Sequence, residues 1–143
     1  LYNFKKENES INLPVISGLS GIQDINNFSQ DAYNKLYLAR FIINQMINID
    51  KFLYNYISEI NFLDSTGVVL YTFDDAVPVY LIDFKDYENF DNEFFNNKIR
   101  EKLIYLNNFL KQVALYKNKN SFICVDLRYQ DIVVVKNNIQ VIK

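Results

Sequence analysis

The chain has 143 residues, of which 50% are hydrophobic and 16% aromatic, and its formal net charge is -2. This length suits one domain with a core of its own, and the apolar content is too high for an intrinsically disordered segment. The basic residues are scattered among acidic ones, without the basic stripe of a nucleic-acid-binding protein. No stretch is apolar over the length that spans a bilayer. Composition therefore predicts a folded domain that binds no nucleic acid.

The beginning of the chain suggests how it is organised. It starts at Leu1 rather than Met and has no signal-peptide pattern, so we expect a piece of a longer protein with its signal or anchor upstream. Residues 1–12 are expected to be a linker or the end of a preceding module, and residues 13–143 one domain. Pro14 favours an extended conformation at Leu13, and Gly18 permits a turn.

A first helix is predicted from a cap at Ser29 or Asp31 to about Ile49. Its apolar residues are three and four positions apart, which is typical of a helix packed on a sheet. They are Leu36, Ala39, Ile43 and Met46, with Leu38, Ile42 and Ile49 widening the stripe. Residues 52–57 fit either a continuation of this helix or irregular structure.

A second helix is predicted from about Asp91 to Tyr116. Its apolar stripe consists of Phe95, Ile99, Leu103, Leu106, Leu110 and Val113. Its polar residues, Lys102 and Asn107 among them, fall largely off the stripe and are expected to face solvent.

Between and after the helices, β-branched and aromatic residues predict five strands at about 58–63, 68–73, 77–82, 122–127 and 132–135. Polar turn residues separate them. Pro78 lacks a backbone N–H, which favours an edge position or a bulge near the start of its strand. The expected fold is α+β, with an antiparallel sheet (a meander plus a C-terminal hairpin) and two main helices packed on one face.

The side chains that usually carry catalysis are scarce. The chain has no His, so a nucleophile would lack its usual base. Cys124 lies in an apolar run and is expected to be a small core residue, and Asp74 and Asp75 read as a solvated turn. No glycine-rich phosphate loop or zinc ligand set is present. We therefore expect no enzyme, no cofactor, no metal and no small-molecule substrate.

Four features, in this order, resemble the extracytoplasmic β-domain of the FtsQ/DivIB family of bacterial cell-division proteins. They are Leu13-Pro14-Val15-Ile16-Ser17-Gly18, Ser58-Glu59-Ile60, the hairpin of residues 67–81 with its acidic turn, and Val125-Asp126-Leu127-Arg128-Tyr129 followed by Val133-Val134-Val135. The resemblance covers residues 13 to about 136 and does not include the family's POTRA module or membrane anchor. The chain has Gln130-Asp131 where the family commonly has Asn-Gly, and Ile82-Asp83 where it has Leu-Gly.

This resemblance implies a non-enzymatic scaffold for cell division and septation. Its parent protein would be anchored in the bacterial cytoplasmic membrane, with this domain on the extracytoplasmic (periplasmic) side at the division septum. Family members bind the division proteins FtsB and FtsL by adding a partner strand to the last strand of the sheet.

The expected partner-binding residues are Arg128, Tyr129, Asp131, Ile132, Val133, Val134, Val135 and Lys136. Residues 132–135 are apolar on both faces and near the chain's end, which favours an edge strand open to strand addition. Arg and Tyr are enriched at binding hot spots. Alternatively, Arg128 could pair with Asp126 or Asp131, Tyr129 could pack under the turn, and residues 137–143 could cover the strand.

A peptidoglycan- or carbohydrate-binding module is the alternative function. Eleven Tyr and twelve Phe could supply stacking surfaces, although most of them fall within the apolar patterns that predict core. Tyr54-Asn55-Tyr56 is the one patch that this alternative singles out.

Overall fold

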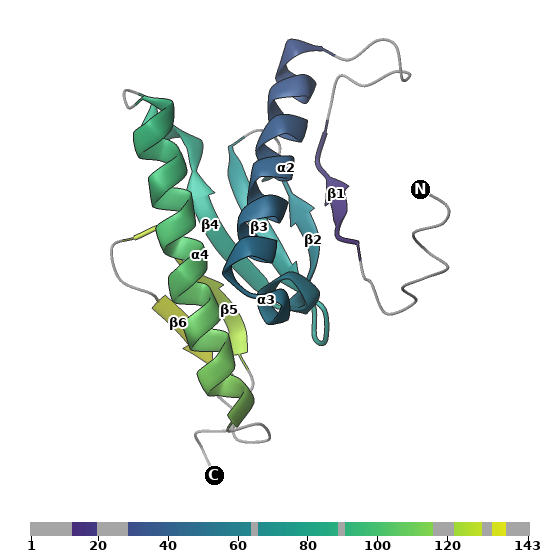
Figure 1. Cartoon of the computed structure of the whole chain (residues 1–143), viewed down its shortest axis with the longest axis vertical. Helices are drawn as coiled ribbons and strands as arrows, with labels where there is room; N and C mark the ends of the chain where they lie inside the picture. The colour runs from purple at the N-terminus through teal and green to yellow at the C-terminus, as the bar shows by residue number, and fades with distance from the viewer. Residues whose placement is uncertain are drawn as a thin grey trace.

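A computed structural model of the chain describes residues 13–19, 29–63, 66–88, 91–115, 122–129 and 133–136. The strands are β1 (Val15–Ser17), β2 (Ile57–Asn61), β3 (Gly67–Thr72), β4 (Pro78–Asp83), β5 (Phe122–Asp126) and β6 (Val133–Lys136). The helices are α2 (Gln30–Ile49), α3 (Lys51–Tyr56) and α4 (Asn92–Leu115), with a short 3-10 helix η2 (Phe84–Tyr87). The six strands form one sheet in chain order, and the helices lie over one face of it (Figure 1). The predicted α+β class is confirmed.

The sheet is mostly antiparallel. The meander β2–β3–β4 and the hairpin β5–β6 are antiparallel, as expected. β1 pairs with β2 in parallel, and β4 pairs with β5 in parallel, so the sheet is mixed rather than purely antiparallel. Parallel neighbours need a long crossover connection, and the helices provide it: α2 and α3 lie between β1 and β2, and α4 lies between β4 and β5.

Side-chain caps set the helix boundaries. Ser29 caps α2, because its hydroxyl accepts a hydrogen bond from the backbone N–H of Ala32 at 3.1 Å. Asp50 has an extended backbone, with φ -171°, and its carboxylate accepts from the N–H of Phe52 at 3.0 Å. One residue therefore ends α2 and begins α3, so residues 51–56 form a separate short helix. Asp91 caps α4 in the same way, accepting from the N–H of Phe94 at 2.9 Å.

Pro78 and Gly18 occupy positions that suit their backbones. Pro78 is the first residue of β4, an interior strand between β3 and β5, where a missing N–H is tolerated. The edge position considered for it is therefore wrong. Gly18 has φ +78°, and a Cβ there would lie 2.9 Å from the backbone nitrogen of Phe62. Both the positive φ and this close approach favour a residue without a Cβ directly after β1.

The core lies between the sheet and the helices. Its fully buried residues include Ala39, Ile42 and Met46 of α2, Ile60, Leu70 and Leu81 of the sheet, and Ile99, Leu103 and Leu106 of α4. The buried side of α2 is slightly rotated from the predicted stripe. Leu36 and Ile43 are only half-buried, whereas Ala32 and the charged Lys35 are buried.

Two polar residues of α4 correct the prediction that they face solvent. Lys102 and Asn107 are 9% and 7% exposed. The Lys102 ammonium donates a hydrogen bond to the carbonyl of Leu127. The Asn107 amide donates to the Asp50 carboxylate at 3.3 Å, joining α4 to the α2–α3 junction. Both residues lie next to apolar positions on the helix, and their side-chain nitrogens donate to groups that the neighbouring elements present. The amide oxygen of Asn107 is buried without a hydrogen-bond partner among the described residues.

Adjacent residues of α4 test this packing. Leu103 is fully buried, whereas Ile104 is 40% exposed. Leu103→Ala should lower the free energy of unfolding by about 2–5 kcal/mol, because it leaves a cavity in the core. Ile104→Ala, the matched control, should change it by less than about 1 kcal/mol. Urea-induced unfolding followed by circular dichroism measures both values. Equal losses in the two variants would contradict the orientation of α4.

Candidate functional site

The last strand of the sheet is the predicted binding edge. β6 stands at the end of the strand order and pairs antiparallel with β5, with Val134 opposite Val125. Within the described residues, β5 is its only strand neighbour. Four of the eight predicted binding residues, Val133–Lys136, form this strand. Asp131, Ile132 and the possible cover at 137–143 lie outside the described residues.

Arg128 is bound within the chain. Its Nε and Nη2 atoms donate to the two carboxylate oxygens of Asp126 at 2.9 and 2.7 Å. The backbone N–H of Arg128 donates to the same carboxylate at 3.0 Å. The alternative pairing with Asp126 is therefore the one that the structure contains. This planar two-point contact fixes the guanidinium and neutralises its charge locally.

The fixed guanidinium lies near two tyrosine rings. Its central carbon is 4.8 Å from the ring centre of Tyr80 on β4 and 5.8 Å from that of Tyr129. Tyr129 is 61% exposed, so it does not pack under the turn. Cation–π contacts of this kind favour a defined ring position. Beside the end of β5, the chain thus presents an exposed aromatic ring next to an immobilised arginine.

The pKa values of this ion pair move in the directions expected from its contacts. Burial raises the pKa of the Asp126 carboxyl, but the hydrogen bonds from Arg128 outweigh it, so the net pKa lies below its usual value. The hydrogen bond to Asp126 raises the pKa of Arg128, against a smaller opposite effect of burial. Both groups therefore stay charged at neutral pH.

The backbone of Leu127, the residue before Arg128, makes hydrogen bonds through both its N–H and its carbonyl group. The N–H of Leu127 donates to the carbonyl of Tyr80 at 2.8 Å, and its carbonyl accepts from the Lys102 ammonium. Burial, with the like charge of Lys98, lowers the pKa of Lys102. Neither Tyr80 nor Lys102 was identified from the sequence as part of this site. The alternation of side chains along a strand predicts the face of β4 on which Tyr80 lies. Its contact with Arg128, however, depends on the parallel pairing of β4 with β5, which was not predicted from the sequence.

The residues singled out for other functions lie elsewhere. Tyr54 is 8% exposed. Tyr56 is half-buried, and its ring stacks on that of Phe52 with the ring centres 5.4 Å apart. These two tyrosines therefore offer no open stacking surface. Cys124 is half-buried rather than a core residue. The described residues contain no group of three or more His, Cys, Asp or Glu placed to hold a metal ion.

Comparisons of this chain with protein-family models, curated proteins and solved structures gave no match. Across the part of the chain that the structure describes, no helix is long and apolar enough to cross a membrane.

The Asp126–Arg128 pair predicts a pH-dependent loss of stability. Asp126→Asn should lower the free energy of unfolding at neutral pH by about 1–3 kcal/mol, because it removes charge-assisted hydrogen bonds. The folded-state pKa of Asp126 is depressed. Its stabilisation is therefore present above the unfolded-state pKa and is lost as the pH falls through the folded-state pKa.

The difference between wild type and Asp126→Asn should therefore shrink below about pH 4, the usual pKa of an Asp carboxyl. Urea unfolding of both proteins at a series of pH values measures it. A difference that stays constant down to about pH 3 would contradict a charged Asp126 in the folded pair.

Proposed function

We propose that this domain is a non-enzymatic scaffold of the bacterial division machinery, which binds FtsB- and FtsL-like proteins by strand addition. In this proposal its parent protein is anchored in the cytoplasmic membrane, and the domain lies on the periplasmic side at the septum. The ordered resemblance from Leu13-Pro14 to Val133-Val134-Val135 motivates the choice of family. The single structural observation that supports it is the terminal position of β6 in the sheet.

Strand addition follows from the chemistry of a sheet edge. A terminal strand has backbone N–H and C=O groups directed away from its one neighbour, and these are satisfied when another strand pairs with them. β6 is built from Val133-Val134-Val135-Lys136, three β-branched residues and one charge. Such a strand pairs readily and has little to repel a partner.

Arg128 and Tyr129 would give this edge its specificity. Backbone pairing alone accepts many sequences, whereas the side chains beside the strand select among them. Arg128 is already fixed by Asp126, and Tyr129 is exposed next to it. A partner side chain would therefore meet a preformed surface, because Arg128 is already held and loses less conformational freedom on binding than a mobile side chain would.

Proline substitutions on β6 test the proposed edge. The N–H groups of consecutive residues in a strand point in opposite directions within the sheet. Of the two variants Val134→Pro and Val135→Pro, one (the inward variant) therefore removes an N–H directed toward β5, and the other (the outward variant) removes an N–H directed away from it. The outward variant should stay folded and bind the extracytoplasmic segment of an FtsB-like protein from the same organism about tenfold or more weakly. Titration calorimetry measures affinity, and circular dichroism checks the fold.

The inward variant serves as the matched control, because it weakens the β5–β6 pairing and lowers the melting temperature. If both proline variants stay folded and bind as tightly as the wild type, the partner site is not on β6. If the wild-type domain binds no FtsB- or FtsL-like segment, the scaffold proposal itself is wrong.

Tyr129→Ala tests the side-chain contribution. Because Tyr129 is 61% exposed, its truncation should change the free energy of unfolding by less than about 0.5 kcal/mol. Loss of an aromatic hot spot should nevertheless weaken partner binding by about tenfold or more. Tyr105→Ala on α4 is the control, since Tyr105 is 50% exposed and belongs to a different surface. Unchanged affinity in the folded Tyr129 variant would remove this residue from the site.

A further inference from the structure

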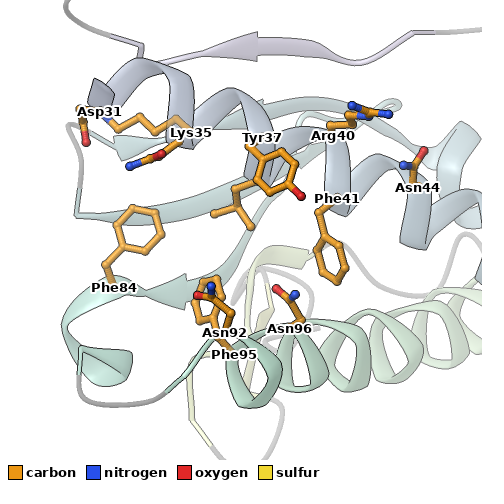
Figure 2. Close-up of a pocket in the computed structure, with 12 residues that line it drawn as sticks. Asp31, Lys35, Tyr37, Arg40, Phe41, Asn44, Phe84, Asn92, Phe95 and Asn96 are labelled. Carbon is orange, nitrogen blue, oxygen red and sulfur yellow. The ribbon is translucent and has the colours of Figure 1, made fainter. Parts of the chain in front are cut away.

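A groove of about 870 Å³ separates residues 31–44 of α2 from η2 and the first turns of α4 (Figure 2). Its volume falls within the range of pockets that hold small or medium-sized ligands. As the described residues define it, every lining side chain belongs to α2, η2 or α4. The groove is therefore a surface separate from the β6 edge.

Aromatic rings and amides dominate the lining. The rings are those of Tyr37, Phe41, Phe84 and Phe95, and the amides are those of Asn34, Asn44, Asn92 and Asn96. In Figure 2, Asn92 and Asn96 project from α4 toward α2, and Tyr37 and Phe41 lie on the facing side. Tyr37 is 73% exposed, so its ring is accessible.

The groove carries little uncompensated charge. Asp31 and Lys35 at one end bind each other, with the ammonium nitrogen 2.9 Å from a carboxylate oxygen. Arg40, the remaining charged residue of the lining, points away from α4 in Figure 2. A phosphate-rich or otherwise polyanionic ligand requires several free cations, so the lining does not favour one.

The mixture of rings and amides also narrows the class of ligand. An apolar helix or strand laid in the groove would bury amide groups without partners, at about 1–3 kcal/mol for each unsatisfied group. An Asn side chain both donates and accepts hydrogen bonds, which matches hydroxyl and acetamido groups. A ring face offers a flat apolar surface, which matches the C–H face of a pyranose.

We propose that this groove binds a neutral saccharide chain, with the exposed Tyr37 ring stacked on a pyranose face and the asparagine amides bonded to hydroxyl or acetamido groups. The rings of Phe41, Phe84 and Phe95 are half-buried against the core and form the apolar floor beside it. On α2 the groove residues Asn34, Tyr37, Phe41 and Asn44 are three, four and three positions apart, which places them along one side of the helix. Asn92 and Asn96 are four apart on α4 and so share one side as well. Two helices thus present matched stripes to one elongated ligand.

The test uses the whole 143-residue chain and a defined probe, the β-1,4-linked hexamer of N-acetylglucosamine. Titration followed by NMR chemical shifts should give saturable binding with shifts on α2 and α4. Tyr37→Ala and Asn96→Ala should each weaken binding by about 2- to 10-fold, as expected for loss of a stacking contact or of a hydrogen bond. The matched controls are Tyr105→Ala and Asn97→Ala, exposed residues of α4 outside the groove, which should change affinity by less than about twofold.

Absence of saturable binding to the hexamer would overturn the proposal. So would equal losses in groove and control variants, or tighter binding of a sulfated hexasaccharide, since that would assign the site to its cations. The outward-directed β6 proline variant should keep its affinity for the hexamer. Failure of strand addition and failure of saccharide binding are therefore distinguishable in one set of proteins.

Discussion

The fold depends on two parallel connections that step across the sheet in the same direction. β1 leads through α2 and α3 to its neighbour β2, and β4 leads through α4 to its neighbour β5. The antiparallel meander between them keeps β2 and β4 in the same orientation. Crossovers of this kind are almost always right-handed, and two of the same hand and direction must place their helices on the same face. This constraint sets α2 beside α4 and leaves the β5–β6 hairpin at the end of the sheet (Figure 1).

Polar side chains of α4 make hydrogen bonds to neighbouring elements at two positions along the helix. Near the middle of the helix, the Lys102 ammonium holds the Leu127 carbonyl, and one turn later Asn107 bonds to Asp50. The hydrogen bond from Lys111, together with that from the Phe52 N–H, lowers the pKa of Asp50, which keeps this capping carboxylate ionised. Apolar packing resists separation of helix and sheet but is not directional, whereas these hydrogen bonds also resist sliding. Of these contacts, the one from Lys102 holds the backbone next to Arg128 at the end of β5.

The sequence predicted what local periodicity determines. The extents of α2 and α4 followed from apolar spacing and side-chain chemistry, as did the strands of the meander, and the cap of α2 is Ser29, one of the two residues predicted for it. Lys102 and Asn107 were misplaced because an amphipathic pattern treats every polar residue as solvent-facing, whereas a burial partner such as the Leu127 carbonyl lies 25 residues away along the chain. Parallel pairing and the Tyr80–Arg128 contact were missed for the same reason. The groove was missed because neither helix contains it alone.

The two proposed sites, the β6 edge and the groove, would recognise their ligands by different physical means. In the proposed binding mode, the edge would offer backbone hydrogen bonds, whose number is set by strand length, and Tyr129 beside it would select among partners. The groove offers ring faces and amides from two helices, whose spacing is set by the packed core beneath them. No described residue contributes to both surfaces. Because separate sites without shared contacts have additive binding free energies, a protein strand and a saccharide would occupy this domain together without competition.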